Sequence, residues 1–208
     1  MATYNFPSIT PTTQTFELVT NTKSFQSPLS NSIQTISRKG SYWKTTMVFN
    51  NLTDDDRGIL QSFITRLNGQ EHRMRIRDYG QPFRGNAPSS DSPITWDGAS
   101  EVIDRLVMTN VTPSIGSYLK RGDYVQVGNQ LHQVTHGSGG DDSDLLANSG
   151  GRCTAYIAPE FITYPADNTP VVLRGATGVF MMTNNPQWRT QAPYVSSITI
   201  EAISDVLA

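Results

Sequence analysis

In residues 41–69 the chain reads SYWKTTMVFNNLTDDDRGILQSFITRLNG, and this stretch decides the fold. Its first part, residues 41–49, alternates as a strand does, because every second side chain from Trp43 to Phe49 falls on one face. Its second part repeats apolar side chains at the spacing of one helix face. The stretch therefore predicts a long strand, followed directly by a helix that packs on a sheet.

The predicted helix covers residues 53–68 and carries signals at both ends. Thr53 can cap the first turn, and Asp56 completes an acidic variant of the capping box. The aspartates of the first turn suit the helix dipole, and they form no metal site because adjacent helical side chains point in different directions. Asn68 and Gly69 supply the C-terminal stop. The stripe expected to face the sheet consists of Ile59, Leu60, Phe63, Ile64 and Leu67.

Outside this helix the chain favours short strands and turns. It contains 16 glycines and 12 prolines among 208 residues, which interrupt regular structure every few residues. A segment rich in glycine, proline and serine, residues 79–92, separates two parts of different texture. We therefore predict a mainly β protein. The expected strands are 15–20, 32–37, 41–49, 71–78, 105–108, 123–127, 130–135, 153–158, 170–173, 178–182 and 194–203.

Composition and charge exclude several classes of protein. The net charge is −2 and only 16% of residues are charged, so no overall basic field attracts nucleic acid. The single cysteine, Cys153, excludes an internal disulfide and a cysteine-built zinc site, and we expect it to be a small buried or half-buried strand residue. The N-terminus lacks the features of a signal peptide, and no apolar run reaches the roughly 18 residues of a membrane span. We expect a protein made in a cytoplasm.

The residue types that carry catalysis or bind metals show no productive pattern. The chain has three histidines, His72, His132 and His136. They do not stand at a paired ligand spacing. The glycine run at 137–140 lacks the lysine of a phosphate-binding loop, and the acidic run at 141–144 departs early from the calcium-loop pattern. The sequence therefore predicts no enzyme, no bound metal and no cofactor.

A strand over residues 71–78 would have two faces of different character. One face carries Arg73, Arg75 and Arg77, and the other carries His72, Met74 and Ile76. The arginine row has three interpretations: a solvated or salt-bridged edge, a charged subunit interface, or a nucleic-acid contact. The last lacks an aromatic platform on the same face on which bases could stack.

The order of elements carries more information than any single motif. Residues 25–29 read Phe-Gln-Ser-Pro-Leu, and Trp43 opens an alternating strand that leads through the capped helix to the strand at 73–77. This order resembles the N-terminal part of distal tail proteins and lambdoid minor tail proteins of long-tailed bacteriophages. The stretches 119–134, 157–159, 164–166 and 178–180 are similar to phage tail-tip proteins.

The resemblance implies an antiparallel β-sandwich with one α-helix at about 53–68, plus an inserted small β-domain. Residues 1–92 with 186–208 would form the ring-forming sandwich, or belt domain, and residues 93–185 the insert. It further implies a structural virion protein of the tail tip, without catalysis or catalytic residues. Such proteins form homo-oligomeric rings, mostly hexamers, that join the tail tube protein to the hub or tip proteins.

Two hypotheses about the site follow. A ring needs two complementary faces on each subunit, so the arginine row of one copy could meet an acidic loop of the next. The candidate interface residues are Arg73, Arg75, Arg77, Asp141, Asp142 and Asp144. The alternative is a carbohydrate- or receptor-binding module with exposed aromatic platforms. Its candidates are Tyr118, Tyr124, Tyr164 and Trp188. We favour the plainer interpretation of these aromatics as core or interface residues.

Overall fold

The computed structural model describes residues 1–96, 102–137, 145–191 and 195–205. The first half contains β1 (Thr3–Asn5), β2 (Thr13–Val19), β3 (Thr22–Gln26), β4 (Ile33–Ser37), β5 (Tyr42–Leu52), α1 (Asp54–Leu67), β6 (Arg73–Ile76) and β7 (Ile94–Thr95). The second half contains β8 (Arg105–Thr109), β9 (Tyr124–Val127), β10 (Gln130–Gly137), β11 (Arg152–Ala158), β12 (Val171–Val172), β13 (Gly178–Met182), β14 (Arg189–Gln191) and β15 (Val195–Ser204). The prediction of a mainly β protein with a single helix is confirmed for the described residues.

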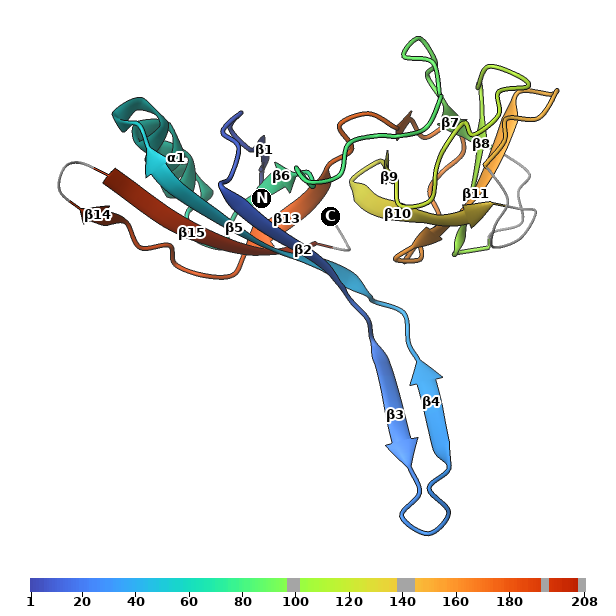
Figure 1. Ribbon diagram of the computed structural model, residues 1–208, viewed down its shortest axis with the longest axis horizontal. Helices are drawn as coiled ribbons and strands as arrows, with labels where there is room; N and C mark the ends of the chain where they lie inside the picture. The colour runs from blue at the N-terminus through green and yellow to red at the C-terminus, as the bar shows by residue number, and fades with distance from the viewer. Residues whose placement is uncertain (97–101, 138–144, 192–194, 206–208) are drawn as a thin grey trace.

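The described strands form three separate sheets, and each sheet gives its name to one part of the molecule (Figure 1). The helix lobe holds a seven-stranded sheet of order β1-β6-β13-β15-β5-β2, with β14 beside β15, and it carries α1. The closed lobe holds a six-stranded sheet of order β12-β9-β10-β11-β8-β7. The arm is the two-stranded ribbon β3–β4, which projects away from both lobes.

Residues 41–69 supply much of the core of the helix lobe. Trp43, Met47 and Phe49 are buried on one face of β5, as the alternation predicts. β15 pairs with β5 in antiparallel register and adds Ile198 and Ile200 to the same core. The sheet is mixed, because β1 pairs with β6 in parallel.

Helix α1 begins and ends as the sequence predicts. Thr53 Oγ1 accepts from the backbone N–H of Asp56 at 3.2 Å and donates to the Asp56 carboxylate at 2.8 Å. Asn68 adopts the left-handed conformation of a C-terminal cap, with φ 48°. The buried face consists of Leu60, Phe63 and Leu67.

The predicted apolar stripe is wrong at Ile59, whose side chain is 49% exposed. Ile64 packs only partly against the core. The buried face of the helix is therefore narrower than the predicted stripe, and Ile59, next to Leu60, lies outside it. Apolar spacing in the sequence does not reveal how wide the covering surface is.

The six-stranded sheet curls until its two end strands meet. Ile94, on β7, forms a bridge with Pro170, next to β12. The backbone N–H of Val171 donates to the carbonyl of Pro93 at 2.9 Å, which completes the closure. Closing a sheet in this way leaves few strand edges open. Cys153 is fully buried in this lobe, as expected, and its burial raises the pKa of the thiol to about 12.

Strand β13 lies in a different lobe from the one that the sequence-based domain boundaries give it. The interval 93–185 assigned β13 to the insert, whereas the strand pairs with β6 and β15 of the helix lobe. A short apolar strand has the same composition in either sheet, so only pairing reveals its place. Gly178 of β13 lies opposite Ile76 of β6, so the chain leaves and re-enters this sheet at adjacent positions.

The turn between β9 and β10 contacts the sheet of the helix lobe. Arg75 donates to the Asn129 side-chain oxygen at 2.7 Å, and the N–H of Val179 donates to the Asn129 carbonyl at 3.3 Å. A Cβ on Gly178 would lie 2.9 Å from the Cβ of Leu131, so a side chain at this position would collide with β10. The two lobes are therefore in direct contact.

Candidate assembly site

The arm is a β-ribbon whose residues lie entirely in solvent. β3 and β4 pair from Thr22 opposite Ser37 to Gln26 opposite Ile33, and every residue of both strands is exposed. The tip is ordered locally, because the N–H of Ser27 donates to the Ser32 carbonyl at 2.9 Å. Each strand has only the other as a partner, so the outer edges of the arm are unpaired (Figure 1).

The register divides the arm into two faces. Directly opposed residues of an antiparallel pair point to the same side, and successive residues alternate. One face therefore carries Lys23, Phe25, Gln34 and Ile36. The opposite face carries mainly hydroxyl and amide groups, namely Thr22, Ser24, Gln26, Thr35 and Ser37, together with Ile33.

Large apolar side chains are concentrated on the arm. Phe25 is 56% exposed, Leu29 at the tip 98%, Ile33 67% and Ile36 48%. Exposed apolar groups gathered in one place mark an interaction surface. An isolated two-stranded ribbon is also only marginally stable in water. Both considerations favour an arm that is covered by another molecule when the protein functions.

The charge of the arm differs in sign from that of the whole chain. Residues 20–41 contain Lys23, Arg38 and Lys39 and no acidic residue. The full chain has a net charge of −2, so the acidic excess lies entirely outside the arm. The body of a second copy is therefore an electrostatically favourable surface for a basic arm.

The predicted arginine row is engaged within the chain. Arg73 Nε lies 2.6 Å from the Asp205 carboxylate, and the two side chains are only 13% and 20% exposed. Arg75 binds Asn129, and β6 lies between β1 and β13 instead of at a sheet edge. Arg77 is exposed and stacks on Tyr79, with its guanidinium 4.6 Å from the ring centre. The contact of Arg73 with Asp205 fits the interpretation of the arginine row as salt-bridged.

Arg73 and Arg75 therefore already have partners within their own chain. Their partners, Asp205 and Asn129, were missed because nothing in the local sequence links them to Arg73 and Arg75. The proposed acidic partners Asp141, Asp142 and Asp144 lie outside the described residues. The contact between the arginine row of one copy and this acidic loop of the next therefore stays a prediction.

The candidate aromatic platforms lie in packed surroundings. Tyr118 is fully buried, which fits its interpretation as a core residue and excludes it as an exposed platform. Its hydroxyl donates to Asp91 at 2.9 Å, and burial together with this bond raises its pKa. Tyr124 contacts the ring of Trp43, and Tyr164 contacts Phe161. Trp188 packs partly against the helix-lobe core.

Two buried polar groups have structural partners. The Asp123 carboxylate accepts the backbone N–H groups of Arg84, Gly85 and Lys120 at 3.0, 3.0 and 2.9 Å. These hydrogen bonds hold residues 84–85, in the connection that leaves the helix lobe, against the start of β9 in the closed lobe. His132 is buried, with its Nδ1 2.7 Å from the Pro159 carbonyl, and burial lowers its pKa to about 4.

The described part of the chain contains no group of three His, Cys, Asp or Glu side chains that could hold a metal ion. Within the same residues, no helix has the length and apolar character needed to cross a membrane. The chain matches no protein-family model and no curated protein. The arm is therefore the feature of the described residues that points most directly to a function.

Proposed function

We propose that this protein is a structural subunit of a bacteriophage tail tip, which assembles through its arm into a ring of identical copies. The observation that carries the proposal is the exposed ribbon β3–β4, with Phe25 and Ile36 on one face and both strand edges unpaired. A protein that acts alone has no use for such a surface, because it costs solubility without contributing to a core.

The arm suits a contact between two different surfaces of identical subunits. A heterologous contact repeated by rotation closes into a ring. If the arm of one copy lies on the body of the next, apolar side chains supply most of the affinity. The basic residues of the arm then set its orientation against the acidic body. The tail-tip location, the hexameric order and the tube and hub partners rest on the resemblance to distal tail proteins.

The test is the mass of the purified protein by light scattering, compared between two double variants of the arm. Phe25→Ser with Ile36→Ser removes the apolar face. Ser24→Ala with Thr35→Ala changes the opposite face at the adjacent paired positions. The parent and the second variant should form rings, and the first should have the 22.9 kDa mass of one chain. Far-ultraviolet circular dichroism spectra should agree among all three, because the arm adds nothing to either core.

A parent protein of single-chain mass at every concentration would contradict the ring. Assembly that survives loss of the apolar face would instead show that the arm is not the contact. The tail-tip assignment is tested separately, by adding the tube and hub proteins encoded by the same genome. A stable complex with them is expected.

A further inference from the structure

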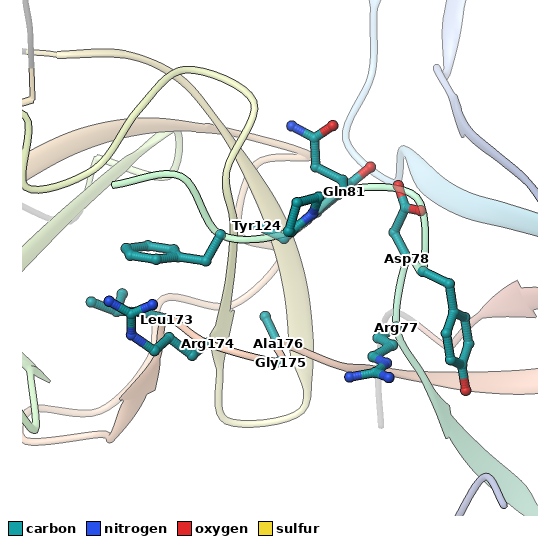
Figure 2. A pocket seen from close by; sticks show the side chains of 11 residues that line it. Arg77, Asp78, Gln81, Tyr124, Leu173, Arg174, Gly175 and Ala176 are labelled. Atoms are coloured by element: carbon teal, nitrogen blue, oxygen red, sulfur yellow. The ribbon is translucent and has the colours of Figure 1, made fainter. Parts of the chain in front are cut away.

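A pocket of about 390 Å³ lies between the two lobes, and the segments that connect them form its walls (Figure 2). Residues 77–79 and 81–83 belong to the connection that leaves β6, and residues 173–176 to the connection that returns to β13. Tyr124 of β9 completes the lining. The volume lies within the range of small-ligand sites.

Two arginines stand at opposite ends of this pocket, with Gly175 and Ala176 between them (Figure 2). Each guanidinium is held against an aromatic ring: Arg77 lies 4.6 Å from the ring centre of Tyr79, and Arg174 lies 4.6 Å from that of Phe83. Arg174 also donates to the Ala87 carbonyl at 2.7 Å. These contacts orient the guanidinium groups but do not neutralise them.

Among the described residues, no carboxylate lies within salt-bridge distance of Arg77 or Arg174. The one carboxylate in the pocket lining, Asp78, accepts the N–H of Gly80 at 2.8 Å and is hydrogen-bonded to Tyr124. Burial and Asp78 raise the pKa of Tyr124, so the phenol stays a neutral donor to this carboxylate. The pocket lining therefore carries two arginines and one carboxylate, which is a net positive charge in a chain of net negative charge.

We propose that this pocket binds a ligand with two carboxylate groups, one held by Arg77 and the other by Arg174. The planar guanidinium has five N–H donors and pairs with a carboxylate through two parallel hydrogen bonds. Arg174 uses one donor on Ala87 and Arg77 is hydrogen-bonded to Tyr79, so each arginine keeps further donors for a ligand. Gly175 has open space where a side chain would stand, so the floor between the arginines has room for the body of the ligand. Such carboxylates come either from a small dicarboxylic acid or from an acidic peptide segment of a partner.

The experiment is calorimetric titration of the full chain at low salt with malonate, glutarate, pimelate and an Asp-Asp-Ser-Asp peptide, with acetate as the single-carboxylate control. The dicarboxylate of matching length, or the peptide, should bind at least about tenfold more tightly than acetate, because each charged contact is worth about that factor. Binding should weaken as salt is raised. Tighter binding of the peptide identifies a protein source, and tighter binding of a free diacid identifies a small molecule.

Two single variants and one matched control make the test specific. Arg77→Gln leaves the Arg174 contacts intact, and Arg174→Gln leaves those of Arg77. Each should reduce the affinity to the level of acetate, while Arg189→Gln, an exposed arginine outside this pocket, should not change it. Acetate binding as tight as every diacid and the peptide, no binding of any probe, or unchanged binding in both single variants would overturn the proposal.

Discussion

The indole Nε1 of Trp43 donates a 2.8 Å hydrogen bond to the backbone carbonyl of Leu131. Trp43 belongs to β5 of the helix lobe and Leu131 to β10 of the closed lobe, and their side chains are 3% and 4% exposed. The Trp43 ring also contacts Phe16 and Tyr124. This pair of residues joins the two lobes by a buried polar contact inside a shared apolar cluster.

We expect Trp43→Phe to lower the free energy of unfolding by about 2–4 kcal/mol. The phenylalanine keeps much of the apolar contact but leaves the Leu131 carbonyl buried without its donor, in addition to a small cavity. Denaturant melts measure the loss. Trp188→Phe, at a half-buried position, serves as the control and should cost under about 1 kcal/mol. Equal losses in the two variants would mean that the lobe contact adds no stability.

The narrow contact face of α1 predicts a contrast between two apolar residues only four positions apart. Phe63→Ala should cost about 3–5 kcal/mol, because the ring is 8% exposed and its loss leaves a cavity. Ile59→Ala should cost under about 1 kcal/mol, because half of its side chain is already in water. The comparison uses denaturant melts at one pH. A large loss at Ile59 would show that the helix packs on a broader face.

Buried Asp123 should be sensitive to truncation. In Asp123→Ala three backbone N–H groups lose their common acceptor, so we expect a loss of about 3 kcal/mol or more in thermal or chemical melts. Asp104→Ala removes an exposed carboxylate from the same lobe, and its effect should stay within about 0.5 kcal/mol. Similar losses in both would refute the anchoring role of Asp123.

The pKa of His132 predicts how stability depends on pH. This histidine has a pKa of about 4 in the folded protein and about 6.5 when unfolded, so between these values only the unfolded chain takes up the proton. The stabilisation is fully present above pH 6.5 and is lost as the pH falls towards 4. Its total is on the order of 3 kcal/mol. The difference in unfolding free energy between parent and His132→Gln should change over this window, and a constant difference would exclude the effect.

The ion pair of Arg73 with Asp205 predicts a folding defect on charge reversal. Arg73→Glu places two carboxylates together in a largely buried site, and we expect a loss of about 3–5 kcal/mol. The double variant Arg73→Glu with Asp205→Arg should recover part of it in the same melts. No recovery would assign the loss to packing of the arginine stem instead. Because of this defect, charge reversal at Arg73 does not report on assembly, and the arm variants do.

Features set by neighbouring residues could be predicted from the sequence. The alternation from Trp43 to Phe49 and the caps at Thr53 and Asn68 were placed correctly, because each depends on side chains a few positions apart. The width of the helix face that contacts the core could not be predicted in this way. Whether Ile59 is covered depends on strands that are distant in the sequence.

Features set by distant pairing could not be predicted. Arg73 and Asp205 are 132 positions apart, and no local pattern links them. The closure of the six-stranded sheet depends on Ile94 meeting Pro170, which are ordinary turn-flanking residues in the sequence. The arm was predicted only in part: residues 32–37 were expected to form a strand, but periodicity does not distinguish a strand in a sheet from one in solvent.

The opposed positions of Ile76 and Gly178 have an evolutionary consequence. The described residues between them leave and re-enter the helix-lobe sheet at one point, and their six-stranded sheet closes on itself. The closed lobe is therefore a self-contained insertion between two neighbouring strands of the helix-lobe sheet. A recombination event could remove it and leave β6 and β13 joined as a simple hairpin, or exchange it for a module of different size and specificity. The replacement would need to supply one apolar residue in the place of Leu131, so that Trp43 stays covered.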